Sequence, residues 1–217
     1  QEVLVKTPSC FVGYYQDPEA TNKALRDGWL HTGDAGYIDD DGHLLIIGRK
    51  EEIMRTKGGE AFSPDFIETR LKFSPYIKEA VIFGEERDYI TGFINIDFGN
   101  VGSWAEDRMI PYTTYSDLSQ RPLVEELILG EVRHVNTQLP KPMRLKKIIL
   151  LYKLLDADDE ELTRTGKVRR KFVYEQYIKL IEAMYSELNE LEVTGKVRYR
   201  DGHVGTIETK VKILTVE

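Results

Sequence analysis

Hydrophobic residues recur at helical spacing in several stretches of the chain, and each such stretch predicts an amphipathic helix that packs against a core. The clearest stretch follows Pro122 and ends before Pro140 and Pro142, because proline suits the first turn of a helix and stops a helix further on. Its apolar face consists of Val124, Leu127, Ile128, Val132, Val135 and Leu139. A long helix is therefore predicted here.

Further helices are predicted on either side of it. One begins after Ser63, a suitable N-cap residue, with Pro64 in the first turn. Another begins at Val168, and a short helix is expected between Asp17 and Leu25. The first of these carries Phe66, Ile67, Arg70 and Leu71, and the one from Val168 carries Val173, Tyr177, Leu180, Ile181, Met184 and Leu188 on one face.

Runs rich in β-branched and aromatic residues predict strands between the helices. These runs are VLVK (3–6), a segment near Tyr37, LLIIG (44–48), IKEAVIFG (77–84), TGFINID (91–97) and KKIILLY (146–152). DDDG at 39–42 predicts a hairpin turn. VTGKVRYR (193–200) and TIETKVKILTV (206–216) alternate like the two strands of a hairpin around Asp201-Gly202. A lone hairpin is only marginally stable, so this one is expected to dock on the rest of the chain.

The order of these elements predicts an α+β fold with three parts. Residues 1–50 are expected to be β-rich, residues 51–184 to form an α+β domain, and residues 185–217 to hold the end of a helix and the hairpin tail. The chain begins with Gln1 and not with Met, which is typical of a processed or excised piece.

Composition narrows the class of protein. Of the 217 residues, 41% are hydrophobic and 31% are charged, as in globular and not in disordered proteins. No apolar run approaches the roughly 20 residues of a membrane span, and no signal peptide is recognisable. A cytoplasmic location is expected, with which a peripheral membrane contact is compatible.

Charge and metal-ligand residues exclude other classes. The net charge of −7 argues against a nucleic-acid binder, because such domains usually carry a basic excess. The single cysteine, Cys10, excludes an internal disulfide. The four histidines have no metal-ligand spacing, so no metal site is expected on this chain. The sequence leaves the oligomeric state open.

Two lysines share the repeated sequence TGKVR, at Lys167 and Lys196. Alternation along the first strand of the predicted hairpin (193–200) puts Lys196, Arg198 and Arg200 on one face, which favours a solvated position. Lys167 follows an acidic run and precedes Arg169, Arg170 and Lys171, which are interpreted either as solvated charges at a helix start or as contacts for phosphate groups.

Three other stretches suggest chemistry. HTGDAG (31–36) is interpreted as an exposed polar turn, in which Asp34 is either a turn residue or a carboxylate that accepts hydrogen bonds from two vicinal hydroxyls, such as those of ribose. Arg49 directly follows a predicted strand, and the simplest interpretation of its charge is a surface ion pair. Gly58 and Gly59 suggest a loop that another group approaches closely.

Taken together and in this order, four motifs resemble the closing motifs of the adenylate-forming superfamily, specifically the long-chain fatty acyl-CoA synthetases. They are DGWLHTGD (27–34), DDDGHLLIIGRKEE (39–52), GGEAFSPDFIE (58–68) and TRTGKVRRKF (163–172). The opening EVLVKTPSCFVGYYQDPEAT also resembles the family segment that precedes HTGD. The resemblance covers residues 1 to about 184. It implies the small mobile C-terminal domain of such an enzyme, preceded by the terminal strands of its large domain.

The resemblance implies a two-step reaction in which ATP and a fatty acid form an acyl-adenylate, and coenzyme A then displaces AMP. It gives Asp34 the ribose hydroxyls and Arg49 a nucleotide contact. It makes Lys167 the catalytic lysine between the substrate carboxylate and the α-phosphate, as expected where one anion attacks another.

The resemblance also makes Glu51 the hinge residue, although the family usually has Asp or Lys there. It places Gly58 and Gly59 at the pantetheine tunnel of coenzyme A. The phosphate loop, the magnesium ligand and the fatty-acyl pocket of the family lie upstream of HTGD, so a Mg²⁺ cofactor, the large domain as partner and inactivity of this chain alone are implied. The sequence leaves two alternatives open: a fatty acyl-AMP ligase that loads a carrier protein, and a noncatalytic interaction module.

Overall fold

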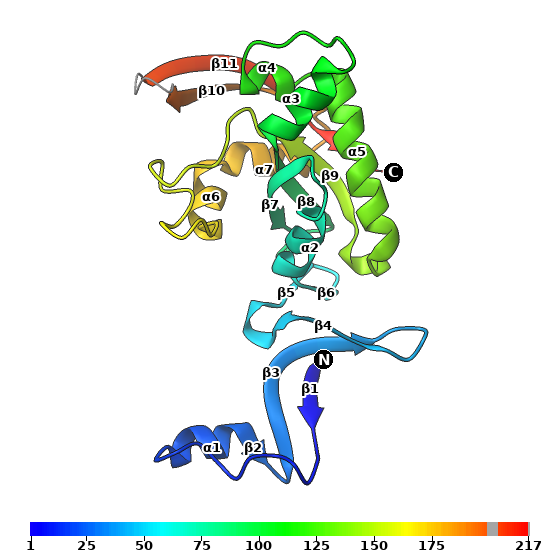
Figure 1. Cartoon of the computed structure of the whole chain (residues 1–217), viewed down its shortest axis with the longest axis vertical. Coiled ribbons are helices and arrows are strands. Elements are labelled where there is room, and N and C mark those ends of the chain that lie inside the picture. The colour runs from blue at the N-terminus through cyan, green and yellow to red at the C-terminus, as the bar shows by residue number, and fades with distance from the viewer. Residues whose placement is uncertain (199–203, 217) are drawn as a thin grey trace.

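The structure, a computed structural model, describes residues 1–198 and 204–216. It is elongated, with a narrow N-terminal part at one end and a larger α+β body at the other (Figure 1). The N-terminal part contains β1 (Glu2–Val5), α1 (Pro18–Ala24), β2 (Leu25–Arg26), β3 (Trp29–Ile38) and β4 (Leu44–Arg49). Strand β3 is its centre, because β1, β2 and β4 all pair with it in antiparallel orientation.

The HTGDAG segment is not the exposed turn that the sequence predicts. It lies inside β3, where Glu2 pairs with Ala35 on one side and Asp34 pairs with Arg49 on the other. The segment is half-buried or buried throughout. Gly33 has φ +74°, and the register of β3 against β4 shifts between Ala35 and Gly36. Glycines therefore bend the strand here instead of ending it.

The body is built on a four-stranded sheet in the order β12-β9-β8-β7. Strands β7 and β8 form an antiparallel pair, and β8 lies parallel to β9. The bounds of its first elements are η1 (Lys50–Glu52), β5 (Met54–Arg55), β6 (Ala61–Phe62), α2 (Pro64–Leu71), β7 (Ile77–Phe83) and β8 (Ile90–Ile96). Those of the remainder are α3 (Phe98–Glu106), α4 (Tyr115–Ser119), α5 (Pro122–Gln138), η2 (Lys141–Met143), β9 (Leu145–Leu150), α6 (Arg170–Gln176), α7 (Ile178–Met184), β10 (Glu190–Arg198), β11 (Val204–Lys212) and β12 (Leu214–Thr215).

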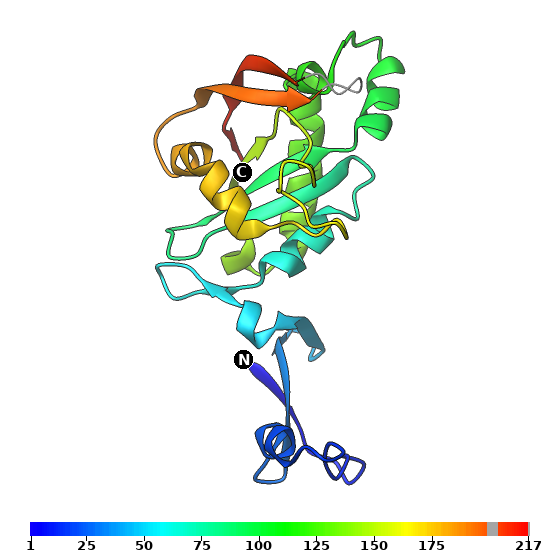
Figure 2. The ribbon, with the colours of Figure 1, turned by 90° about the vertical axis from the view of Figure 1, so that its left-hand side faces the viewer.

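The sheet separates two apolar cores. Alternate residues of the inner strand β8 face opposite sides of the sheet. Ile94 therefore belongs to the core under α2 and α5, and Phe93 to the core under α6 and α7. Figure 2 shows these helices on the two sides of the sheet. Ala35 and Ile47 from the N-terminal part join the first core, which connects β3 and β4 to α2.

Most of the predicted elements are confirmed, and Ser63 caps α2 by accepting from the Phe66 amide at 3.3 Å. The helix expected from Val168 differs. It begins at Arg170, breaks at Tyr177 and ends at Met184, and Leu188 lies beyond it with 49% of its surface exposed. Val168 instead forms a β-bridge with Leu162, so the base of the preceding loop takes the place of the first helical turn.

The C-terminal tail forms the predicted hairpin of β10 and β11 and then docks through β12, which pairs with β9 and forms one edge of the sheet. Val211 and Ile213 are buried in the second core, and Val216 is buried in the first. Arg200 and the turn at Asp201-Gly202 lie outside the described residues, as do the side chains of Lys196 and Arg198. Their predicted solvation therefore stays a prediction.

Candidate active site

Asp34 and Arg49 face each other across β3 and β4. Their carboxylate and guanidinium groups form an ion pair, with 3.2 Å between Arg49 Nη1 and Asp34 Oδ1. Arg49 also donates to the Thr32 carbonyl at 3.3 Å, so the guanidinium bridges two groups of β3. The Asp34 side chain keeps 37% of its surface exposed and the Arg49 side chain 63%. Both side chains are thus accessible to a ligand, and their ion pair fixes their orientation.

An open hollow of about 550 Å³ lies beside this pair. Its walls come from β3, β4, η1 and α2, and the loop that carries Lys167 contributes none of them. Phe66 and Phe73 supply aromatic surface, and Phe73 is 81% exposed. The structure therefore brings Asp34 and Arg49 together at one hollow and leaves Lys167 elsewhere.

The segment between the N-terminal part and the body holds the other predicted residues. Glu51 lies exposed in η1, the single 3₁₀ turn directly after β4. Gly58 and Gly59 form an exposed turn between β5 and β6, in which Arg55 Nη1 donates to the Gly59 carbonyl at 2.9 Å. Gly59 has φ +84°, which requires glycine, whereas Gly58 has no such constraint.

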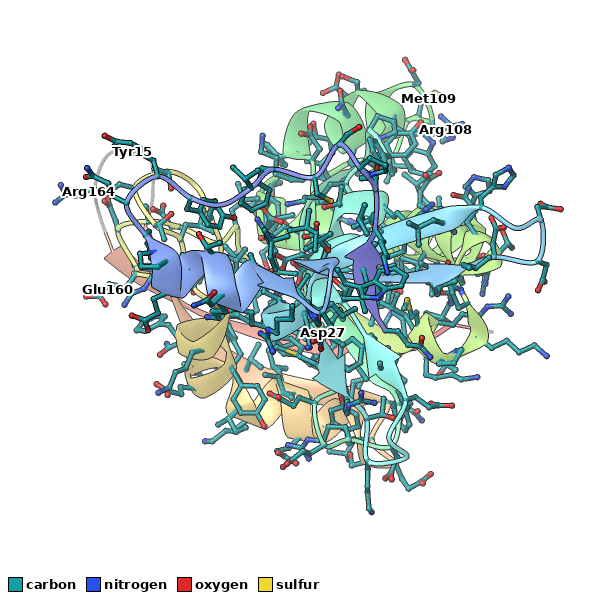
Figure 3. The ribbon with its side chains drawn as sticks, turned by 90° about the horizontal axis from the view of Figure 1, so that it is seen from below. Tyr15, Asp27, Arg108, Met109, Glu160 and Arg164 are labelled. Carbon is teal, nitrogen blue, oxygen red and sulfur yellow. The ribbon has the colours of Figure 1, made fainter. Side chains whose placement is uncertain are left out.

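Lys167 lies near the tip of the loop between β9 and α6, which projects away from the sheet (Figure 1). The tip is a tight turn in which the Thr163 amide donates to the Lys167 carbonyl at 2.7 Å and the Lys167 amide donates to Thr163 Oγ1 at 3.0 Å. Gly166 has φ +79° and completes the turn. The Lys167 side chain is exposed, and its ammonium group forms no ion pair with the residues that the structure describes. Seen from below in Figure 3, Glu160 and Arg164 of the same loop point outward at the edge of the molecule.

Arg170 is not a solvated charge, although it follows Lys167 closely. Its guanidinium contacts both oxygens of Glu68, donates to Asp65 Oδ1 at 2.7 Å and donates to the Ile82 carbonyl at 3.2 Å. Glu68 also accepts from the Ile82 amide at 2.8 Å. Burial raises the pKa of Glu68, and the hydrogen bond from Arg170 offsets only part of that rise. This cluster fastens α6 to α2 and β7.

Asp39, Asp41 and His43 come together at the β3–β4 turn, with their ligand atoms within 4.8 Å of one another. Sequence spacing did not predict this group. The Asp39 carboxylate accepts from the backbone amides of Asp41 and His43, at 3.0 and 2.8 Å, as expected of an aspartate that closes a turn. The geometry of the turn therefore explains why these three side chains lie close together.

The family model for the AMP-binding enzyme C-terminal domain matches residues 51–189. The chain belongs to this family. The resemblance inferred from the four motifs is thereby confirmed, and so is the α+β fold class of a C-terminal domain of adenylate-forming enzymes.

Long-chain fatty-acid–CoA ligases are among the curated proteins to which this chain is similar. FadD15 of Mycobacterium tuberculosis is 35% identical over 187 residues, which cover 86% of this chain and 31% of the relative. Human long-chain-fatty-acid–CoA ligase 6 is 32% identical over 189 residues, which cover 85% of this chain and 27% of the relative. The chain thus spans less than a third of the length of these relatives.

Solved structures agree with the fold. Apo MatB from Rhodopseudomonas palustris superposes with a TM-score of 0.54 at 26% identity, over 82% of this chain and 30% of that one. The adenylation domain of a carboxylate reductase from Mycobacterium chelonae gives a TM-score of 0.53 at 21% identity, over 85% of this chain and 27% of that one, and supports the fold alone. Among the described residues, no helix is both long and apolar enough to cross a membrane.

Proposed function

We propose that this chain is the C-terminal portion of a long-chain fatty acid–CoA ligase, which forms an acyl-adenylate from ATP and a fatty acid and then transfers the acyl group to coenzyme A. The observation that carries the proposal is the exposed ammonium of Lys167, which forms no ion pair with the described residues, on a projecting turn of a domain from the AMP-binding enzyme family. The names of the curated relatives support the fatty-acid substrate and the coenzyme A acceptor.

In the first half-reaction a carboxylate oxygen attacks the α-phosphorus of ATP and pyrophosphate leaves. Two anions must approach each other, and a cation between them lowers the barrier. Lys167 can supply that cation because the described residues do not neutralise its ammonium group. The Lys167 loop lies apart from the Asp34–Arg49 hollow, so the proposal requires the body to turn relative to the nucleotide site, and Glu51 is the proposed hinge.

Asp34 is proposed to hold the ribose hydroxyls of the nucleotide. A carboxylate can accept from two neighbouring hydroxyls, and Arg49 orients it through the 3.2 Å ion pair. Arg49 is proposed to contact the nucleotide with its remaining N–H groups. The magnesium that accompanies ATP is proposed to find its ligands in the upstream large domain, which is the expected partner of this chain.

Gly58 and Gly59 are proposed to line the path of the pantetheine thiol. A Cβ atom at Gly58 would meet only Thr56 Oγ1, at 3.7 Å, which is an ordinary contact. The described part of the chain therefore gives no steric reason for glycine at this position. An approaching substrate gives one, because a side chain would fill the space that the thiol needs.

Replacing Asp34 with asparagine in the complete enzyme tests the nucleotide assignment. Asparagine keeps the shape but loses the charge, and a hydrogen bond to a charged group contributes about 1.5–3 kcal/mol. The dissociation constant for AMP, measured by isothermal titration calorimetry, is expected to rise on the order of tenfold. Glu52→Gln is the matched control, because Glu52 is an exposed acid at the same hollow. Unchanged AMP binding in the Asp34 variant would refute the assignment, whereas a complete parent protein that binds no AMP would favour a noncatalytic interaction module.

Replacing Gly58 with leucine tests the acceptor path. Overfilling a close-fitting site costs about 1–3 kcal/mol, so thioester formation from supplied acyl-adenylate should slow roughly tenfold to a hundredfold. Adenylate formation and the melting temperature should stay the same, since this backbone accepts a side chain. The same assay with free coenzyme A and a holo carrier protein in competition separates a CoA ligase from a fatty acyl-AMP ligase. Equal slowing of both half-reactions would remove Gly58 from the path.

A further inference from the structure

Glu161 is a buried carboxylate below the Lys167 loop, with 1% of its surface exposed. Lys153 Nζ lies 2.9 Å from Oε1 in an ion pair and donates to Oε2 at 3.0 Å. The Tyr177 hydroxyl donates to Oε1 at 2.6 Å, and the Asp156 amide donates to Oε2 at 3.0 Å. Each oxygen therefore faces hydrogen-bond donors, which only an ionised carboxylate can satisfy in full.

The backbone of Glu161 closes the base of the loop. Its amide donates to the Asp156 carbonyl at 3.0 Å, and its carbonyl accepts from the Arg169 amide at 2.8 Å. Directly above, Leu162 and Val168 form the β-bridge that leads into the turn holding Lys167. The outgoing and the returning segment of the loop are thus hydrogen-bonded to each other at Glu161, a few residues from Lys167.

The Glu161 side chain ties this base to two separate elements of the body. Lys153 lies just beyond β9, and Tyr177 lies at the junction of α6 and α7. Burial raises the pKa of Tyr177, and the charge of Glu161 raises it further. Burial alone would lower the pKa of Lys153, but its contacts with Asp159 and Glu161 outweigh that effect and hold it above its ordinary value.

We propose that Glu161 is a positioning residue for adenylation, which holds the projecting loop in one geometry so that Lys167 enters the nucleotide site already oriented. This inference rests on the proposed function. The physical reason is preorganisation: a small displacement of a stabilising cation removes much of its effect on the transition state.

A role in stability alone explains the cluster less well. A buried ion pair seldom stabilises a fold more than apolar side chains of the same volume would, so its benefit lies in fixing one geometry. The apolar second core already holds α6 and α7 on the sheet. The turn above Glu161, in contrast, is exposed from Arg164 to Lys167, and Leu162 and Val168 at its base are only partly buried against the second core.

The test is Glu161→Gln in the complete enzyme, with Tyr177→Phe as a milder variant that removes one donor to Glu161. In Glu161→Gln the amide NH₂ would face Lys153 and one further donor. Acyl-adenylate formation should slow about tenfold or more, while thioester formation from supplied acyl-adenylate stays near its original rate. Tyr177→Phe should show the same split to a smaller extent. Peptide-resolved hydrogen exchange should quicken at the Lys167 and Arg169 amides and stay unchanged at the Leu151 amide of the sheet.

Glu125→Gln is the matched control. Glu125 is also a buried carboxylate paired with a lysine, at 2.9 Å from Lys212, but it lies on α5. It should alter neither the ratio of the half-reactions nor exchange in the loop. Equal slowing of both half-reactions in Glu161→Gln, or unchanged exchange at Lys167, overturns the inference. If Lys167→Ala itself leaves adenylation intact, the proposed function fails instead, so the two failures are distinguishable.

Discussion

Replacing Lys167 with alanine in the complete enzyme is expected to slow acyl-adenylate formation about a hundredfold to a thousandfold, the usual effect of removing one preorganised donor, about 3–4 kcal/mol. The ammonium is exposed and unpaired among the described residues, so its removal leaves no buried charge behind. The melting temperature should therefore stay nearly constant. Thioester formation from supplied acyl-adenylate should also keep its rate, because that step involves no attack of one anion on another.

Single-turnover measurements of each half-reaction check this expectation, with Lys179→Ala as control. Lys179 is an exposed lysine on α7 and differs from Lys167 in its place, not in its charge. Equal loss in both half-reactions would remove Lys167 from adenylation. A loss confined to thioester formation would assign the residue to the acceptor instead.

The elements that the sequence predicts well are those with a long hydrophobic period. Helix α5 extends over 17 residues and keeps one apolar face between prolines, so local and tertiary preferences agree. Helix α3 was not predicted because Gly99 and Gly102 interrupt its pattern, although Asp97 caps it and Val101 and Ala105 are buried.

HTGDAG shows how strand pairing overrides local preference. Its composition is that of a turn, and the residues that make it a strand lie far away in sequence, in β1 and β4. The resemblance assigned Asp34 and Arg49 separately to the nucleotide, and the structure places the two residues as register partners. Sequence resemblance thus selected the two residues individually, whereas their contact and the backbone conformation depended on strand pairing that a local pattern does not contain.

The sequence pattern could not predict the buried charges around the Lys167 loop. Glu68, Glu161 and Arg170 are residue types that usually lie on the surface, and hydrophobic periodicity assigns them to solvent. Arg170 finds Glu68 at a separation of 102 residues in the sequence. Only the folded chain shows that Glu161 is buried and Arg170 half-buried, while Lys167, between them in sequence, is exposed.

Replacing Arg170 with alanine is expected to lower the free energy of unfolding of the chain by about 3 kcal/mol or more, because Glu68 would then be buried without a counter-ion. The Ile82 amide would remain as a hydrogen-bond donor to the carboxylate. Urea unfolding measures the loss, which corresponds to a fall in melting temperature of about 6–12 °C for a chain of this size. Arg169→Ala is the control: its surface pair with Glu160, at 2.9 Å, should be worth about 0–1 kcal/mol.

The deficit of the Arg170 variant should depend on pH in a defined direction. Burial already raises the pKa of Glu68, and removing Arg170, the cation that offsets this, raises it further. A carboxyl whose pKa is higher in the folded than in the unfolded state costs stability when ionised, and the cost falls as pH drops through the folded-state pKa. The deficit relative to the parent chain should therefore be smaller at about pH 5.5 than at about pH 7.5. A deficit that grows on acidification would mean that Arg170 stabilises the fold through its packing and not through the charge of Glu68.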